Sequence, residues 1–279
     1  MTTPVMEAVS MLTPAKSVDV LADHRSSELL EPAPYVSTIF HRRKKAGCMQ
    51  QIALLKNLRL TKYDLIVDLR TGFLPYLLLS NHHYIKNRKH YFGSHAVEEH
   101  YSTIRRLGQV PSSAPDCKIY VDESSRIAAD SMTQSLPAGK WLAVAPGANW
   151  PGKKWPAKNY GALAAQLAST GTQPVILGTV NEEPLAAVIR ASCKDAIDLT
   201  GQTSLAEIAA LADVARGAVG NDTGPMHMIA AAGCPSVVLF SEASEPCLTA
   251  PRGPNINILQ RASLVDIPLD EVAAALTLR

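Results

Sequence analysis

The sequence lacks the long apolar runs that mark membrane-spanning and secreted chains. No run of about 18 apolar residues occurs, and the longest candidate, LPYLLLS at residues 74–80, is too short to cross a bilayer. The first 15 residues contain no basic region followed by an unbroken apolar core, so no signal peptide is expected. With 47% hydrophobic residues over 279 positions, the composition instead indicates a soluble globular protein of one large or two ordinary domains.

Paired cysteines are also missing. The five cysteines form no C-x-x-C pair, which predicts reduced thiols in a cytoplasmic protein and argues against a metal cluster: Cys48, Cys117, Cys193, Cys234 and Cys247.

Two common nucleotide-binding signatures are absent or broken. No G-x-G-x-x-G follows an expected strand, which argues against a nicotinamide dehydrogenase. Gly147, Gly152 and Lys153 have P-loop spacing, but Lys154 stands where a P-loop requires Ser or Thr. Pro151 removes a backbone N–H that such a loop would use. A magnesium-dependent ATPase or kinase site is therefore not expected here.

The charge is nearly balanced overall but unevenly distributed. Residues 1–137 carry 17 Lys+Arg against 13 Asp+Glu, whereas residues 138–279 carry 10 against 12. This excess is too small for a nucleic-acid-binding protein. Much of the basic charge gathers at residues 41–45, 86–89 and 105–106. It is either an ordinary solvated surface or a patch for an anionic acceptor or an anionic membrane face.

Strand-like runs alternate with helical patterns, which predicts an α/β fold with mostly parallel strands. In the first half the expected strands are residues 17–23, 35–40 and 63–69, and residues 47–60 have helical spacing. The chain becomes polar near residues 124–140 and ends that stretch in Pro-Ala-Gly-Lys. We therefore expect an N-terminal domain at 1–137 and a C-terminal domain at 138–279.

The second half has the more regular pattern. Strands are expected at 141–146, 174–178, 196–201, 217–222 and 236–240, with helices at about 156–170, 183–193, 205–212 and 225–232 between them. This describes a doubly wound sheet with a ligand crevice beyond the carboxyl ends of its strands. Gly147, Gly178, Gly201 and residues 221–224 all fall at such ends.

The stretch GNDTGPMHMIAAAG at 220–233 is the most informative. Asp222 or Thr223 can cap the helix that follows, Pro225 suits its first turn, and Gly233 suits its end. The free N–H groups of such a helix, together with its dipole, can bind a phosphate without a metal, and His227 would lie in the same turn. The alternative is an ordinary capped helix with a structural histidine.

Together with APGANWPGKKWP at 145–156 and VILGTVNEE at 175–183, this stretch resembles the bacterial heptosyltransferases, glycosyltransferase family 9. The similarity is dense from about residue 141 to 245 and weaker, but in order, through YDLIVDLR and earlier. The resemblance implies a GT-B fold: two Rossmann-like domains facing a cleft, with the sugar donor held mainly by the second. It implies transfer of heptose from ADP-heptose to the lipopolysaccharide inner core.

Carried over by position, the resemblance implies a donor site without a metal or cofactor. Asp222 would reach sugar hydroxyls, and the backbone of the turn would meet the diphosphate. Lys153 would supply positive charge, and Glu182 would hold the ribose, with Glu183 as a close competitor. The full expected donor-binding set is Asn149, Lys153, Glu182, Asp222, Thr223, Gly224 and His227.

The catalytic base cannot be assigned from these motifs. Family members begin with a strand and a Gly-Asp segment whose aspartate is taken as the base. This chain begins at MTTPV, which matches the segment after it, so the first strand and the base are expected to be missing and the N-terminal domain incomplete. That strand would lie in the middle of the sheet. Asp64 and Asp68 flank a strand, and Asp68 is a weak substitute for the base.

Five histidines lie between residues 82 and 100: His82, His83, His90, His95 and His100. None of these pairs has the i, i+3 or i, i+4 spacing of a helical metal site, so no metal is expected. With the basic residues between them they form either an acceptor-side loop or a disordered basic loop.

The expected function is an inverting, metal-independent transfer of heptose or a similar sugar from an ADP-sugar to a lipopolysaccharide core acceptor. The expected location is the cytoplasm, as a peripheral protein at the inner membrane, with no nucleic-acid partner. The alternative is a non-catalytic or degenerate nucleotide-sugar-binding paralogue that lacks the base.

Overall fold

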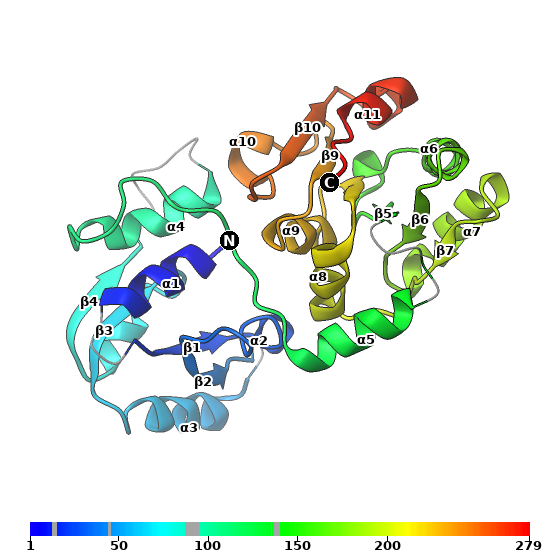
Figure 1. The fold of residues 1–279 in the computed structure, drawn as a ribbon. Helices are drawn as coiled ribbons and strands as arrows, with labels where there is room; N and C mark the ends of the chain where they lie inside the picture. The colour runs from blue at the N-terminus through cyan, green and yellow to red at the C-terminus, as the bar shows by residue number, and fades with distance from the viewer. Residues whose placement is uncertain (13–15, 44–45, 87–94, 135, 137–139) are drawn as a thin grey trace. The chain divides into compact units, whose positions relative to one another are not determined.

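The chain folds into two compact units, Met1–Cys117 and Lys118–Arg279. The computed structural model (Figure 1) describes residues 1–12, 16–43, 46–86, 95–134, 136 and 140–279. The division between the units precedes the boundary expected at 137–138. The reason is that helix α5 (Glu123–Thr133) packs against α8 (Leu205–Val214), which places Ala129 in the core of the second unit.

The second unit is a six-stranded parallel sheet in the order β10-β9-β8-β5-β6-β7. This is the order of a doubly wound nucleotide-binding sheet, so the predicted architecture is confirmed. Its strands are β5 (Trp141–Ala145), β6 (Gln173–Ile176), β7 (Ile197–Asp198), β8 (Gly217–Asn221), β9 (Ser236–Phe240) and β10 (Ile256–Gln260). Its helices are α5, α6 (Ala157–Ser169), α7 (Glu183–Ser192), α8, α9 (Gly224–Ala231), α10 (Pro246–Thr249) and α11 (Leu269–Ala275). The sequence did not reveal α5 or β10.

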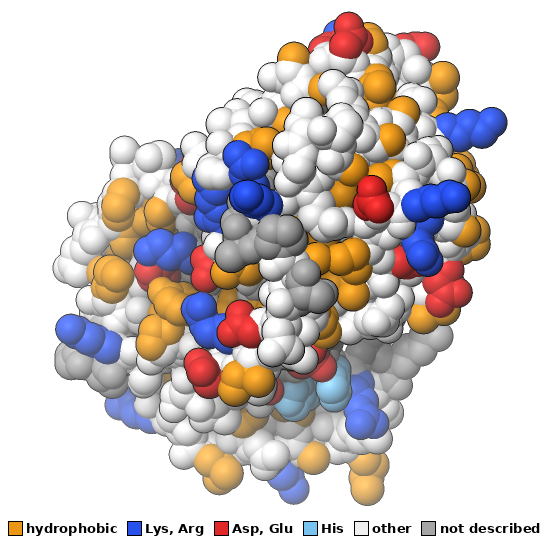
Figure 2. Space-filling view, turned by 45° about the vertical axis from the view of Figure 1, so that its right-hand side comes forward, with side chains coloured by type: hydrophobic (Ala, Val, Ile, Leu, Met, Phe, Trp, Pro, Cys, Tyr) orange, Lys and Arg blue, Asp and Glu red, His pale blue; other side chains and the backbone are white. Residues whose placement is uncertain are grey.

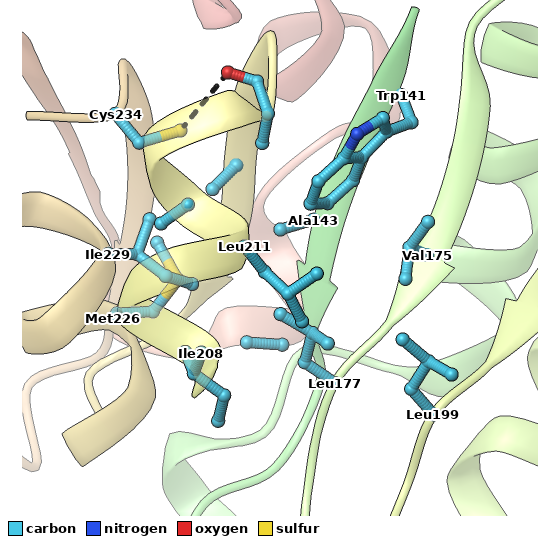
Figure 3. Close-up of a cluster of buried hydrophobic side chains, with 14 of the residues drawn as sticks. Trp141, Ala143, Val175, Leu177, Leu199, Ile208, Leu211, Met226, Ile229 and Cys234 are labelled. Atoms are coloured by element: carbon cyan, nitrogen blue, oxygen red, sulfur yellow. Dashed lines mark hydrogen bonds between the residues drawn. The ribbon is translucent and has the colours of Figure 1, made fainter. Parts of the chain in front are cut away.

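Two hydrophobic cores hold this sheet, one on each face. On one face Ile208 and Leu211 of α8 and Met226 and Ile229 of α9 pack against the strands (Figure 3). On the other face, residues of α6, α7 and α11 do the same. Every residue of β5, β8 and β9 is buried. Because both faces of the sheet are covered, the sequences of these strands are continuous apolar runs. The packed sheet holds the loops at its carboxyl edge in place.

The first unit is built differently. In the described residues its strands form two separate parallel pairs, β1 with β2 and β3 with β4, so β1 and β3 each pair on one side only. The elements are α1 (Thr3–Leu12), β1 (Val18–Ala22), α2 (His24–Ser27), β2 (Val36–His41), α3 (Cys48–Leu58), β3 (Tyr63–Asp68), the 3₁₀ helix η1 (Leu74–Leu77), β4 (Ser80–Ile85) and α4 (Ala96–Arg105). The sequence predicted β1, β2, β3 and α3 and missed the rest.

A single small core joins the two strand pairs of the first unit. Val5 and Val9 of α1 and Tyr101 and Ile104 of α4 are buried in it, and Val18 of β1 and residues of β3 pack against it. The Tyr63 hydroxyl of β3 also donates a hydrogen bond to Asp19 Oδ2 of β1 (3.2 Å). In the described residues the first unit thus has one apolar core, whereas the second unit has two.

The surface carries both signs of charge. Figure 2 shows acidic and basic side chains interspersed on the face in view, with apolar side chains between them. Within the residues described, no helix combines the length and apolar character needed to span a bilayer.

We expect backbone amide hydrogens to exchange far more slowly in β5 and β8 than in β1 and β3. The two central strands are bonded on both sides and covered on both faces, whereas β1 and β3 each leave one edge unpaired. Residue-resolved hydrogen–deuterium exchange measures this directly, with β8 as the internal standard. Equal protection in all four strands would contradict the description of the first unit.

Candidate functional site

Strands β5 and β8 are neighbours at the centre of the second unit's sheet. From β5 the following strands are added on one side, and from β8 they are added on the other, so the strand order reverses between these two strands. The loop after β5 and the turn after β8 therefore start side by side at the carboxyl edge. In a doubly wound sheet this switch point is where a ligand crevice forms. The two loops contain APGANWPGKKWP and NDTGPMH, the motifs that the sequence singled out.

Asn221, the last residue of β8, ties these two loops together. Its side chain is fully buried and makes four hydrogen bonds. Nδ2 donates to the carbonyls of Pro146 (2.8 Å) and Gly147 (3.2 Å), while Oδ1 accepts from the Trp155 backbone N–H (3.0 Å) and the Tyr160 hydroxyl (3.0 Å). Asn221 thus satisfies both ends of the β5–α6 loop, which fixes the path of the residues between them.

The two tryptophans of this loop have opposite environments. Trp155 is buried, its Nε1 donates to the Ile267 carbonyl (3.0 Å), and its ring packs edge-on against Tyr160 at a centroid distance of 4.8 Å. Trp150 is 62% exposed. Between them, residues Pro151–Lys153 form one 3₁₀ turn, η2. Trp155 therefore anchors the far end of the loop, and the turn presents Lys153.

Lys153 meets Asp222 directly beyond β8. Lys153 Nζ lies 2.8 Å from Asp222 Oδ2, and His227 Nε2 lies 3.9 Å from Asp222 Oδ1. Burial raises the pKa of the Asp222 carboxyl, but the neighbouring His227 together with the hydrogen bond and positive charge of Lys153 outweigh burial and leave that pKa below its ordinary value. Asp222 is therefore an anion that is held between two basic groups.

The amino end of α9 is open beside this pair. Thr223 is the N-cap residue, but its side chain makes no capping hydrogen bond and its hydroxyl instead donates to the Asn221 carbonyl (3.3 Å). Gly224, the first residue of the helix, is exposed, and Pro225, the second, has no N–H. The expected helix at 225–232 is confirmed with a shift of one residue. Its uncapped first turn can receive an anion.

Glu182 lies against Gly147, the second residue after β5. Its carboxylate Oε2 accepts hydrogen bonds from the Thr179 backbone N–H (2.8 Å) and hydroxyl (2.6 Å). A Cβ on Gly147 would lie 2.8 Å from Glu182 Cγ, and one on Gly178 would lie 3.0 Å from Glu182 Cβ. The two strand-end glycines therefore make room for Glu182. Glu183 is exposed at the start of α7.

The second-unit residues expected in the donor set do converge on one edge of one sheet. Asp222, Thr223, Gly224 and His227 follow β8, Lys153 contacts Asp222, and Glu182 contacts the Gly147 position. Asn149 is exposed in the same loop. Sequence reasoning missed Asn221, Trp155 and Tyr160 as organisers of the site. Their signal was present: a polar residue directly after the all-apolar GAVG of a buried strand needs hydrogen-bond partners.

Asp68 belongs to the first unit and holds a turn. Its carboxylate accepts the backbone N–H groups of Arg70 (2.8 Å), Thr71 (2.7 Å) and Gly72 (2.8 Å), and also the Thr71 hydroxyl. Burial raises the pKa of Asp68, but these hydrogen bonds outweigh it and lower the pKa. A carboxylate with its lone pairs occupied in this way is a poor proton acceptor. Asp64 is exposed and accepts a long hydrogen bond from Asn81 Nδ2 (3.4 Å).

The histidines expected in a loop are mostly in regular structure. His82 and His83 lie in β4, His95 is the N-cap residue of α4 and accepts the Val97 N–H (3.2 Å), and His100 lies within α4. His90 lies outside the described residues. Burial lowers the pKa of His100 to about 4, so it is neutral at physiological pH. Among the residues that the structure describes, no three His, Cys, Asp or Glu side chains group as a metal ion would need.

Comparison with known proteins points to one family. The model described as glycosyltransferase family 9 (heptosyltransferase) matches residues 70–266. The chain is 25% identical over 268 residues to lipopolysaccharide heptosyltransferase 3 of Escherichia coli, which covers 86% of this chain and 79% of that protein.

Among the solved structures that share its fold are two with similar chain lengths. A glycosyl transferase family 9 protein from Veillonella parvula has a TM-score of 0.83 at 21% identity, covering 98% of this chain and 91% of that one. The E. coli ADP-heptose lps heptosyltransferase II has a TM-score of 0.81 at 22% identity, covering 98% and 92%. The predicted fold class, an α/β GT-B fold, is confirmed.

Asn221→Asp should destabilise the second unit strongly. The substitution replaces the NH2 group that donates both hydrogen bonds by one carboxylate oxygen that faces the Pro146 and Gly147 carbonyls, at a cost of about 2–6 kcal/mol. Tyr160→Phe is the matched control, because Oδ1 keeps the Trp155 N–H, and should cost about 1 kcal/mol. Thermal unfolding of the three proteins measures both, and a similar small loss in both variants would show that Asn221 does not hold the loops.

Asp68→Asn separates a structural role from a catalytic one. Because the folded-state pKa of Asp68 is lowered, its stabilising contribution is complete above the ordinary carboxyl range and is lost as the pH falls below about 4. Asp68→Asn should therefore lower the melting temperature at pH 7, and the difference from the parent should shrink at pH 3. A variant with unchanged melting temperature and abolished sugar transfer would instead identify Asp68 as the base.

Proposed function

The chain belongs to glycosyltransferase family 9, and we propose that this glycosyltransferase transfers heptose, or a similar sugar, from an ADP-sugar to a lipopolysaccharide core acceptor. The similarity to E. coli lipopolysaccharide heptosyltransferase 3 supports the acceptor class. The fold shared with an ADP-heptose lps heptosyltransferase supports the donor class. The observation that carries the proposal is the Lys153–Asp222 pair beside the uncapped amino end of α9.

We assign the diphosphate of the donor to the first turn of α9. The backbone groups of Thr223 and Gly224 and the positive end of the helix dipole supply favourable charge there. Lys153 is within reach, since it already contacts Asp222 at 2.8 Å. Asn149, exposed in the same loop, would add a polar contact to the phosphates.

Because Lys153 is paired with Asp222, donor binding would change the contacts of Asp222. A diphosphate carries more negative charge than one carboxylate and competes for Lys153. Once Lys153 turns to the phosphates, Asp222 can accept hydrogen bonds from sugar hydroxyls, and His227 stays beside it. Glu182, held beside Gly147, would accept from the ribose hydroxyls through its Oε1, with Glu183 as the alternative.

The chemistry proposed is a single displacement with inversion. Negative charge develops on the leaving ADP, and Lys153 and the α9 amino end stabilise that charge electrostatically. These groups supply positive charge without a metal or cofactor. A general base must remove the acceptor proton from the opposite face of the sugar. We leave the base unassigned, because the hydrogen bonds of Asp68 make that carboxylate a weak candidate.

We further propose that the enzyme works in the cytoplasm as a peripheral protein at the inner membrane. All five cysteines are free thiols, as in proteins of reducing compartments. The excess of basic residues in the first 137 positions suits an anionic saccharide or membrane surface better than a nucleic acid, because it is small and confined to a few clusters.

The donor assignment is tested with Lys153→Ala and Asp222→Asn. Loss of a charge-assisted contact in Lys153→Ala should weaken ADP binding roughly 10- to 100-fold. Asp222→Asn removes a negative charge near the diphosphate, so ADP affinity should hold or rise while sugar transfer falls at least 100-fold, about 3 kcal/mol of transition-state stabilisation. Calorimetry with ADP and mass spectrometry of a core acceptor measure the two effects.

Lys158→Ala provides the matched control, since Lys158 is exposed on α6 and should leave both readouts unchanged. Unchanged ADP affinity in Lys153→Ala would overturn the site. ADP binding by the parent protein without transfer to any core acceptor would favour the non-catalytic sugar-nucleotide-binding alternative.

A further inference from the structure

The turn that follows β9 contains a buried hydroxyl group without a hydrogen-bond partner. Ser244 Oγ is shielded from solvent, and no group in the described part of the chain bonds to it within ordinary distance and angle. The backbone there is satisfied, because the Ser244 N–H donates to the Ser241 carbonyl (3.2 Å). A buried polar atom without a partner costs folding free energy, so such an atom in a native protein calls for an explanation.

This turn lies at the carboxyl edge of the sheet, where the candidate donor site is. Strand β9 pairs in parallel with β8, and Asp222 directly follows β8. The Asp222 N–H donates to the Leu239 carbonyl of β9 (3.3 Å). The chain leaves β9 after Phe240, and Ser244 belongs to the turn that comes next. The turn after β9 therefore begins beside Asp222.

The Ser244 hydroxyl is close to the Asp222 carboxylate. Burial raises the pKa of Asp222, and the Ser244 hydroxyl is among the neighbouring groups that lower it. A hydroxyl lowers the pKa of a carboxyl group by stabilising the charged form, which requires the two side chains to face each other. The contact nevertheless falls short of a full hydrogen bond, since Ser244 Oγ has no partner of ordinary geometry. Asp222 Oδ2 is held by Lys153 Nζ, at 2.8 Å.

Asp222 would lose this partner in the donor complex that we propose, because Lys153 would turn to the diphosphate. The Asp222 side chain is only 9% exposed. His227 Nε2, at 3.9 Å from Asp222 Oδ1, is beyond hydrogen-bond distance. A nearly buried carboxylate without a donor is unfavourable, and its orientation toward the sugar is no longer fixed. Another donor of the protein has to hold it.

We propose that Ser244 is a positioning residue for Asp222, and that its hydroxyl donates a hydrogen bond to the carboxylate when Lys153 turns to the diphosphate. The hydroxyl hydrogen can rotate about the Cβ–Oγ bond, so a small movement of the two side chains completes this bond. Asp222 would then keep its orientation toward the sugar hydroxyls. The inference rests on the proposed function and deepens it, because it names the group that holds Asp222 while the sugar is bound.

Burial and the contacts of the turn exclude two other roles. Solvent does not reach Ser244 Oγ, so a sugar hydroxyl would not reach it unless the turn rearranged. The hydroxyl is not needed to form the turn either. The Ser241 hydroxyl accepts the Ala243 N–H (3.3 Å), and the Ser241 carbonyl accepts the Ser244 N–H. Ser244 therefore acts through Asp222, neither as a sugar ligand nor as a support of the turn.

Steady-state kinetics of Ser244→Ala test the proposal. The substitution should lower kcat for sugar transfer roughly 10- to 100-fold, as expected when a hydrogen bond to a charged group is lost. The KM for the donor, the affinity for ADP and the melting temperature should stay near those of the parent. Lys153 and the amino end of α9 are unchanged, and the deleted hydroxyl had no partner whose bond is broken.

Two further substitutions at this position separate hydrogen bonding from size. Ser244→Cys keeps the volume but has a weak donor, so its kcat should fall as in Ser244→Ala. Ser244→Thr keeps a hydroxyl group and should restore most of the rate. A Ser244→Ala enzyme with the kcat of the parent would overturn the proposal.

Ser241→Ala is the matched control from the same turn. Ser241 is buried, and its hydroxyl accepts a backbone hydrogen bond within the turn. Its loss should lower the melting temperature slightly and leave kcat unchanged. An equal loss of kcat in Ser241→Ala and Ser244→Ala would assign the effect to the turn as a whole and would also overturn the proposal.

The contact itself can be measured without sugar transfer. In NMR spectra at neutral pH, the signal of the isotope-labelled Asp222 carboxyl group is assigned from its absence in Asp222→Asn. Ser244→Ala should change the chemical shift of this group more with ADP bound than without it, because Lys153 then faces the diphosphate. An identical Asp222 shift in the ADP complexes of the parent and of Ser244→Ala would show that the hydroxyl does not bond to the carboxylate.

Failure of the proposed function would give a different pattern, because it would appear in the parent protein. A parent that binds ADP but transfers no sugar would contradict the activity, and the NMR comparison would still decide whether Ser244 contacts Asp222. A parent that does not bind ADP would contradict the donor site, and with it the movement of Lys153 on which the Ser244 contact depends.

Discussion

The site depends on one buried amide. Asn221 is enclosed at the end of β8, and its side chain can be tolerated there only because all four of its hydrogen bonds are made. Those bonds join the strand to the start of the β5–α6 loop, to its end and to the following helix. The sheet beneath is packed on both faces, so Asn221 is held in a fixed position. Its hydrogen bonds therefore fix a loop whose regular structure is one 3₁₀ turn.

That constraint explains why Lys153 and Asp222 are in contact. A flexible lysine on a free loop would lose side-chain entropy to reach a carboxylate, whereas here both ends of its loop are fixed. The partly buried pair has little net charge, so neither ion is left without a counter-charge at this position. In the donor complex that we propose, a diphosphate would replace Asp222 as the anionic partner of Lys153. Donor binding would then also free Asp222 to accept hydrogen bonds from sugar hydroxyls.

The sequence predicted the second unit well, because its signals are local. Buried parallel strands appear as apolar runs, and glycines mark their ends. In GNDTGPMH, several residues are of types that favour the start of a helix. The edge strand β10 was missed because INILQ alternates weakly and follows a proline-rich loop. The contacts of Asn221 could not be predicted, since its partners lie 61 to 75 positions away and only the sheet order brings them together. In the first unit α1 and β4 lacked clear periodicity, and α5 was read as a junction because its face toward α8 is mostly small residues.

The two units differ in how completely they bury their own surface, and this difference fits a division of work. The second unit needs groups held within hydrogen-bond distance of a small polar ligand, which requires a closed core and satisfied polar atoms. In the part of the first unit that the structure describes, strand edges are unpaired and large apolar side chains are exposed. Three of those exposed side chains, Ile52, Phe73 and Leu77, line one cavity, and the others lie elsewhere on the unit. Because local opening is easiest where buried apolar contacts are few, the first unit should open more readily than the second.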